Sequence, residues 1–469
     1  MESPLLFAVI IYIIFTVMLG IYASRFVKSA ADFAVAGKRL PLFLSATTLF
    51  ATWFGAETIL GATAEFVEKG ILGVIEEPFG SALCLFLVGA FFAKRLYRMN
   101  ILTFGDFFKV RFGKDVELVS SLLMFLSFLG WTAAQFVAWG IMLSSITGIS
   151  AQQGIVIGAI IIMIYTNVGG MWAISITDFV QTIVIIAGLL FLAVDLYMQI
   201  DSIDKVIANT PKGFFDFLPP PDFTSISQYM SAWMAVGLGS IASQDVLQRI
   251  MASKSEKVAV RASYLGGFMY LTIATLPLLI GLLSKELYPH LLGQDMQMLL
   301  PNVVKNTHIL VQIMFFGALL SAIMSTASGT LLAPSTVLAE NLIKPYLKKE
   351  LTDKQLLRLF RLCVFIFACL ALCIASFKGN IYALASYAST VNLVCLFIPL
   401  LAGMFWKRST GLGAMLSMFF GLLTWLGFEL YPLEIPALLF GLLASIIGML
   451  VGSFLQKNND TATTEKKPS

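Results

Sequence analysis

Charged residues are scarce in this sequence. Asp, Glu, Lys and Arg make up only 12% of the 469 residues, whereas 58% are hydrophobic. A water-soluble protein of this length could not hide so much apolar surface, so the composition excludes an ordinary soluble enzyme and indicates a chain whose solvent is lipid. The small net charge of +4 gives no indication of nucleic-acid binding.

Histidine and cysteine are also rare, with 2 and 5 residues respectively. The spacing of the cysteines fits no metal site, so we interpret them as small apolar core residues inside membrane spans. The sequence contains no recognisable nucleophile–base pair or phosphate-binding loop, and we do not expect an enzyme. The cysteines are Cys84, Cys363, Cys369, Cys373 and Cys395.

Long apolar runs are what the sequence has in abundance. Each is roughly 20 residues long, which suffices to cross a hydrocarbon core of about 30 Å. We predict an all-α membrane protein with about thirteen transmembrane helices. The predicted spans are 4–24, 41–65, 71–93, 118–147, 152–168, 172–198, 226–248, 258–283, 306–338, 357–376, 381–405, 411–430 and 435–455.

Lys and Arg are distributed unevenly between alternate loops. If the N-terminus is outside, most of the 31 basic residues fall on the cytoplasmic side, in clusters near 25–39, 94–114, 249–261 and 344–361. This asymmetry follows the positive-inside rule, and it requires an odd number of spans. We therefore predict a multi-pass protein of the plasma or inner membrane, with the N-terminus outside and the C-terminus in the cytoplasm.

Three predicted spans carry glycine and small polar residues at mid-depth: LFATWFGAETILGA at 49–62, VGLGSIASQD at 236–245 and ALLSAIMSTASGT at 318–330. Such residues weaken a helix and free carbonyl groups that lipid cannot satisfy, so these groups must face protein or a water-filled cavity. The first two stretches lie in the second and seventh spans. This offset predicts a core of two five-helix inverted repeats, each with one broken helix.

The predicted organisation has five parts. These are a leading transmembrane helix at 1–25, a first inverted repeat at 40–200, a second at 224–406, two trailing transmembrane helices at 410–455 and a cytoplasmic tail at 456–469.

Five motifs of the chain resemble the solute:sodium symporter family, in the order in which that family carries them. The resemblance covers most of the chain and is nearest to the choline-transporter-like and proline-symporter branches. It implies the inverted-repeat fold and sodium-driven uptake, with Na⁺, a small solute and the lipid bilayer as partners. The motifs are ATWFGAET at 51–58, LTFGDFFKVRFG at 102–113, YTNVGGMWAISITDFVQ at 165–181, LQRIMASKSEK at 247–257 and SAIMSTASGTLLAPSTVLAEN at 321–341.

A sodium site is the first implication of this resemblance. Ser325 and Thr326 share a helix face with a carbonyl one turn earlier, and oxygen atoms are the ligands that a hard cation prefers. The alternative is that these small residues only pack against another helix. The backbone carbonyls of Ala51 and Phe54, expected opposite these hydroxyls, become available as ligands only if span 41–65 unwinds near Gly55. The resemblance places the site at Ala51, Phe54, Ala322, Ser325 and Thr326.

Carboxylates inside the predicted spans mark the solute site. A charge near the bilayer centre costs about 2.5–3.5 kcal/mol on insertion scales, so it should face a cavity or a partner. We expect Glu57 to line the solute cavity, although it could instead be a structural carboxylate bonded to an amide of the broken helix. Glu76 and Glu77, beside Pro78, form either an acidic wall of the cavity or a helix N-terminus favoured by the dipole.

Two tryptophans add an aromatic component. Trp53 and Trp131 match positions that the choline branch uses to surround a quaternary ammonium by cation–π attraction, although Trp131 could equally be a packing residue. Ser81 and Ser243 stand where that branch has further aromatics, so choline is not specified. The predicted solute-binding residues are Trp53, Glu57, Thr58, Glu76, Glu77, Ser81, Trp131, Ser243 and Gln244.

Three further polar residues are predicted to act in coupling or gating. Asp178 could pair with a basic residue, aid a second sodium ion or make polar helix contacts. Gln248 and Arg249 lie nearer the inner surface, where a gate or a snorkelling arginine is expected. Tyr387 and Asn392 are additional cavity candidates.

The predicted function is sodium-coupled symport of a small amine-containing solute, either a quaternary ammonium such as choline or an amino acid, by alternating access. One alternative keeps the fold and couples transport to protons through Glu57 or Asp178. Another is a channel or a ligand sensor that does not pump.

Overall fold

The computed structural model describes residues 3–347, 350–377 and 379–456. Within these ranges the chain forms helices and loops without a strand; one isolated bridge joins Leu40 to Ser253. Of the predicted tail 456–469, all but Gln456 lies outside the described residues. Ten helices of the described ranges are long and apolar enough to cross a membrane: Pro4–Phe26, Ile71–Met99, Lys114–Thr147, Ala151–Tyr197, Glu256–Leu287, Ile309–Tyr346, Asp353–Ala375, Ile381–Phe405, Gly411–Leu430 and Ala437–Leu455.

One of these helices, α9 (Ala151–Tyr197), covers two predicted spans. Its backbone leaves helical geometry at Gly170, with φ 51° and ψ −147°. The hydroxyl of Tyr165 hydrogen-bonds to that of Thr177, although twelve residues of straight helix would separate them by about 18 Å. The helix therefore bends back sharply at Gly170 and forms two arms, as the sequence predicts.

The predicted break in span 41–65 is present. Helix α3 (Leu42–Trp53) ends before Gly55, and the chain resumes as a wide turn at Glu57–Gly61 that leads into α4 (Ala62–Lys69). The amide of Gly55 donates to the carbonyl of Trp53 at 3.0 Å and not to that of Ala51, which would be its acceptor in a continuous helix. The break thus frees the Ala51 carbonyl.

The predicted break in span 226–248 is also present. Helix α11 (Phe223–Gly237) gives way to a tight turn at Gly239–Ala242, and Ser243 is extended with φ −84° and ψ 132°. Helix α12 (Gln244–Ala252) follows directly. The third unusual span is different, because α16 (Ile309–Val337) is continuous and its small polar residues are buried against protein.

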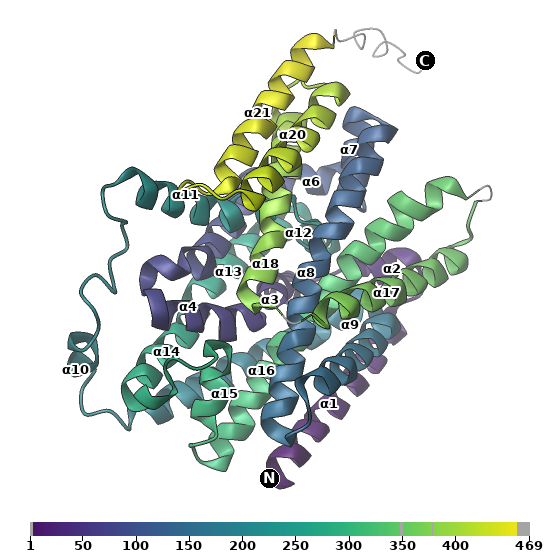
Figure 1. Cartoon of the computed structure of the whole chain (residues 1–469). Helices are drawn as coiled ribbons and strands as arrows, with labels where there is room; N and C mark the ends of the chain where they lie inside the picture. Colours follow the sequence, from purple (N-terminus) through teal and green to yellow (C-terminus); the bar gives the residue numbers. More distant parts are fainter. Residues whose placement is uncertain (1–2, 348–349, 378, 457–469) are drawn as a thin grey trace.

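The broken helices lie among the other helices of the fold. Helices α9 and α16 pack along each other, and both pack against α3 and α8. The start of α1 and the end of α21 lie at opposite ends of the molecule, as an odd number of spans requires (Figure 1). The other helices are α1 (Ser3–Ala23), α2 (Ala30–Val35), α5 (Ser81–Leu87), α6 (Ala93–Met99), α7 (Phe104–Phe112), α8 (Lys114–Thr147), α10 (Ile203–Ala208), α13 (Glu256–Ile273), α14 (Thr275–Leu287), α15 (Leu299–Val304), α17 (Asp353–Ala375), α18 (Ile381–Val391), α19 (Ile398–Phe405), α20 (Gly411–Leu430) and α21 (Ala437–Leu455).

The cysteine prediction is correct in part. Cys84, Cys363 and Cys395 are buried, but Cys369 and Cys373 are exposed on α17. The core interpretation is wrong for these two, because they lie four residues apart on the outer face of a helix whose solvent is lipid.

Candidate functional site

A cluster of oxygen atoms lies where α16 crosses the break in α3. The hydroxyl of Ser325 is 2.9 Å from the carbonyl oxygen of Ala51 and 2.6 Å from a carboxylate oxygen of Asp178 on α9. The hydroxyl of Thr326 is 3.4 Å from the same carbonyl. All four residues are fully buried, so three helices bring oxygen atoms together away from solvent.

Two of the acceptors in this cluster compete for the same proton. The hydroxyl of Ser325 carries one proton, which it can donate to Ala51 or to Asp178 but not to both at once. The other carboxylate oxygen of Asp178 accepts a hydrogen bond from Thr48. Such an arrangement of hydroxyl, carbonyl and carboxylate oxygens suits a hard monovalent cation.

The two remaining residues of the predicted sodium site are close along the chain. Phe54 is buried and follows the last turn of α3, with non-helical φ −82° and ψ 71°. Ala322 is buried on α16, one turn before Ser325. The structure therefore puts the predicted residues on the two facing elements that the sequence indicates.

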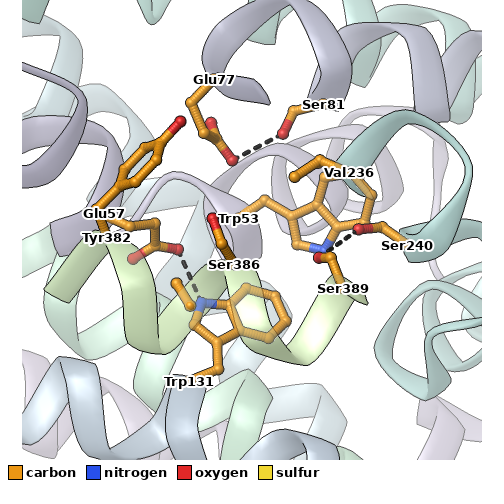
Figure 2. A pocket seen from close by; sticks show the side chains of 11 residues that line it. Trp53, Glu57, Glu77, Ser81, Trp131, Val236, Ser240, Tyr382, Ser386 and Ser389 are labelled. Carbon is orange, nitrogen blue, oxygen red and sulfur yellow. Dashed lines mark hydrogen bonds between the residues drawn. The ribbon is translucent and has the colours of Figure 1, made fainter. Parts of the chain in front are cut away.

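A central cavity with an empty volume of about 380 Å³ lies beside the break (Figure 2). Helices from both halves of the chain form its wall. Five of the predicted solute residues line it: Trp53, Glu57, Glu77, Ser81 and Trp131. Six residues without a predicted role in solute binding also line it: Val236, Ser240, Tyr382, Ala385, Ser386 and Ser389.

Glu57 is held in this wall by two side chains of α8. One carboxylate oxygen accepts from the indole nitrogen of Trp131 at 2.8 Å, and the other accepts from the amide nitrogen of Gln135 at 2.6 Å. The amide oxygen of Gln135 in turn accepts from the backbone of Ala56 at 3.2 Å. Gln135 therefore ties the broken helix and the Glu57 carboxylate to α8.

Glu77 also lines this cavity (Figure 2). Its carboxylate accepts from Ser81 at 2.8 Å, from Thr58 at 3.4 Å and from the phenol of Tyr270. Its backbone is extended, with φ −133° and ψ 113°, and the regular helix α5 begins only at Ser81.

Glu76 faces a second cavity, with an empty volume of about 720 Å³. Tyr387, Trp425 and Glu429 also line that cavity, and the hydroxyl of Tyr387 donates to Glu429 at 3.1 Å. The carboxylate of Glu76 accepts from Ser386 at 2.5 Å, and Ser386 lines the central cavity. The adjacent carboxylates of Glu76 and Glu77 thus line different cavities. Ser386 bonds to Glu76 and also lines the central cavity.

Three predicted solute residues lie behind the cavity wall. Thr58 contacts Tyr270 at 2.7 Å, and Ser243 donates to Asp245. Gln244 accepts from the amide of Phe104 at 2.9 Å and donates to the carbonyl of Leu102 at 3.2 Å, so it joins α12 to the start of α7.

Arg249 is completely buried, which excludes the snorkelling interpretation. Its guanidinium donates to Thr52 at 2.9 Å and to the carbonyl of Asp245 at 3.0 Å. The carboxylate of Asp245 accepts from the indole nitrogen of Trp53 at 2.7 Å. A polar chain thus runs from the cavity wall into the protein. Gln248, the residue before Arg249 on α12, donates to Thr336 at 2.9 Å.

Helix α18 supplies a cavity face that the sequence analysis missed. Tyr382, Ser386 and Ser389 line the cavity at helical spacings of four and three residues, a signal that was available in the sequence. The hydroxyls of Ser389 and Ser240 are 2.9 Å apart and join α18 to the second break. The residues singled out instead, Tyr387 and Asn392, lie elsewhere: Tyr387 at the second cavity and Asn392 beside Ser127.

Comparisons with known proteins agree with this architecture. A model described as "Sodium:solute symporter family" matches residues 33–421. The human high affinity choline transporter 1 is 28% identical over 89% of this chain and 75% of its own length. The sodium/proline symporter of Escherichia coli K12 is 28% identical over 96% of this chain and 94% of its own length. The outward-open structure of a Na⁺-coupled sialic acid symporter has a TM-score of 0.86, with 19% identity, and covers 96% of this chain and 97% of that one. At that identity the structural likeness shows the fold, a helical inverted-repeat core with two broken helices.

Proposed function

The chain belongs to the sodium:solute symporter family, and from this premise we propose that it is a sodium-coupled symporter that imports a small amine-containing solute by alternating access. The observation that carries the proposal is the buried contact between Ser325 and the freed carbonyl of Ala51, beside the carboxylate of Asp178. We assign Na⁺ to this cluster, with Ala51, Phe54, Ala322, Ser325 and Thr326 as its ligands.

The driving force is sufficient for concentrative uptake. One charge crossing 100 mV provides about 2.3 kcal/mol, and a tenfold sodium gradient adds about 1.4 kcal/mol. Since about 1.4 kcal/mol corresponds to a factor of ten, one sodium ion concentrates a neutral solute several hundredfold.

The same broken helix carries both sites, which provides a route for coupling. Ala51 lies before the break and Glu57 lies after it. A Cβ atom at Gly55 would be 2.7 Å from the Thr326 hydroxyl and 2.5 Å from the Glu57 carboxylate. A cation that fixes the break in one conformation therefore also fixes the position of the solute-facing carboxylate, in the outward-open state of the cycle.

We assign solute contacts to the predicted residues that line the cavity, namely Trp53, Glu57, Glu77, Ser81 and Trp131, together with Tyr382. Glu76 belongs to the outer approach to this cavity. Thr58, Ser243 and Gln244 support the wall from behind. Asp178, Gln248 and Arg249 act in coupling or gating through their buried contacts with α3 and α16.

We also propose the membrane topology and the organisation predicted from the sequence. The N-terminus is outside, and the repeats occupy 40–200 and 224–406, after a leading helix at 1–25 and before two trailing helices at 410–455. The basic clusters of the loops support this orientation.

Uptake into proteoliposomes tests the proposal. At fixed pH and fixed membrane potential, solute uptake above the equilibrium level requires an inward Na⁺ gradient and stops when K⁺ replaces Na⁺. Concentrative uptake that persists in K⁺ and follows a pH gradient would instead support proton coupling through Glu57 or Asp178. Non-saturating flux would support a channel, and binding without transport would support a sensor.

A further inference from the structure

We propose that the solute is a small dication that carries N–H donors at both ends, such as a short alkane diamine, with one ammonium group at Glu57 and the other at Glu77. This inference rests on the proposed function, because it concerns the same cavity. A dication with N–H donors at both ends is a narrower class of solute than amines in general. It excludes quaternary ammonium compounds and amino acids.

The two cavity carboxylates, Glu57 and Glu77, have neutral hydrogen-bond partners. Glu57 accepts from an indole and an amide, and Glu77 accepts from three hydroxyl groups. In the part of the chain that the structure describes, six ion pairs lie within 4.0 Å, and neither carboxylate takes part in one. Among the described residues that line the cavity, none is Lys, Arg or His.

The buried Asp245 has a different environment, because Arg249 lies one turn away and contacts its backbone carbonyl. Among the residues that the structure describes, a positive charge thus lies near that carboxylate, and neither cavity carboxylate is ion-paired. Glu57 and Glu77 are only 3% and 8% exposed, and a buried charge without a counter-charge is expensive. A ligand with two positive charges matches the two negative charges of the wall.

A hydroxyl group of the cavity wall also lacks a partner. The phenol oxygen of Tyr382 is buried there, and it has no hydrogen-bond partner among the described residues. A primary ammonium group has three N–H donors, so it can satisfy a carboxylate and a hydroxyl together. A quaternary ammonium group has no N–H donor, so it cannot bond to this oxygen itself.

The aromatic side chains of the cavity wall also favour an alkane diamine. The indole nitrogens of Trp53 and Trp131 are already bonded to Asp245 and Glu57, so their rings offer the solute apolar faces. These faces suit a short alkyl chain. An amino acid fits less well, because its carboxylate group would enter a cavity that already has two carboxylates and no basic residue.

The experiment uses the purified full chain in lipid nanodiscs with Na⁺. Thermal unfolding is followed while 1,4-diaminobutane, 1-aminobutane, choline or proline is added. We expect 1,4-diaminobutane to stabilise the chain at concentrations at least tenfold lower than the other three solutes. Across wild-type titrations from 1,2-diaminoethane to 1,6-diaminohexane, we expect an optimum length, because the two carboxylates are fixed.

Three variants locate the binding site. E57Q and E77Q should each reduce the preference for 1,4-diaminobutane over 1-aminobutane to within about twofold, because one counter-charge is lost. E429Q is the matched control, since its carboxylate lines the second cavity and accepts from Tyr387, and it should retain the preference. Loss of the preference in E429Q alone would place the dication in the second cavity and overturn the inference.

The outcomes distinguish this inference from the proposed function. Sodium-dependent binding of choline or proline at lower concentrations than any diamine would overturn the dication and leave sodium-coupled amine symport intact. A flat response across the diamine series would also overturn it. Absence of any sodium-dependent response to all of these amines would contradict both proposals.

Discussion

The hydroxyl of Ser325 lies 2.9 Å from the carbonyl oxygen of Ala51, so α16 touches the broken helix α3 where its hydrogen-bond ladder fails. The two residues are 274 positions apart in the sequence. The contact depends on Gly55, whose amide bonds to Trp53 and leaves the Ala51 carbonyl free.

A substitution at Gly55 should disturb both proposed sites, because an added side chain would meet residues of each. G55A would place a Cβ atom 2.5 Å from Glu57, 2.7 Å from Thr326 and 3.0 Å from Gln135, so these groups must move apart. We expect the half-saturating concentrations of Na⁺ and solute to rise together, each at least tenfold, in transport assays. G427A on α20 is the matched control, because its Cβ atom would meet nothing within 4 Å. A change in only one of the two concentrations would show that the break does not couple the sites.

A substitution of Trp131 tests whether its hydrogen bond to the Glu57 carboxylate contributes to solute binding. W131F keeps an aromatic ring in the cavity but removes the 2.8 Å hydrogen bond to Glu57. Loss of a hydrogen bond to a charged group costs about 1.5–3 kcal/mol, so the KM for solute should rise at least tenfold. The control is W139F on the same helix, since the buried indole nitrogen of Trp139 has no hydrogen-bond partner in the described part of the chain. Equal effects of the two substitutions would indicate general packing damage.

Arg249 is predicted to stabilise the buried polar chain around the second break. R249M keeps the approximate length but removes two hydrogen bonds and the positive charge near Asp245. We expect a lower thermal midpoint, corresponding to about 1–3 kcal/mol, together with loss of transport. R408M changes an exposed arginine that contacts the Phe454 ring, and it should leave the midpoint almost unchanged. An unchanged midpoint in R249M would mean that the buried charge contributes nothing to stability.

Gln244 is predicted to fasten the loop before α7 to the second broken helix. Q244L removes the acceptor of the Phe104 amide and the donor to Leu102. Hydrogen–deuterium exchange over residues 102–106 should become about five- to tenfold faster, because one buried hydrogen bond contributes about 1 kcal/mol. Q248L, one turn away on α12, changes a contact with Thr336 and should not affect this segment. Unchanged exchange in Q244L would show that the loop is held by other contacts.

The membrane helices and the two helix breaks, which leave a strong pattern in the local sequence, could be predicted well. Apolar length gave the membrane helices, and glycine beside small polar residues located both breaks, because these residues weaken a helix wherever it lies. The same composition does not break α16, whose polar groups are buried against neighbouring helices. Local sequence thus identifies positions where a break is possible, and tertiary contacts decide which of them break.

The solute cavity could be predicted only in part. Trp53, Glu57, Glu77, Ser81 and Trp131 were identified because a polar or aromatic residue at mid-depth is unusual or because the family resemblance marked it. The opposite orientations of Glu76 and Glu77 depend on an extended backbone at Glu77 that no local pattern indicates. Gln135 was missed because its function depends on contact with Glu57, 78 residues away.

The most direct test of the sodium cluster measures thermal unfolding of the purified chain at constant ionic strength while Na⁺ replaces K⁺. A ligand that binds only the folded state raises its stability in proportion to log concentration once sites are filled. We predict that Na⁺ raises the midpoint of the wild-type chain and of S335A, whose hydroxyl bonds only within α16 at 2.5 Å, and that S325A loses this response. An equal response of S325A and S335A to Na⁺, or a wild-type response to K⁺ as large as that to Na⁺, would contradict the account.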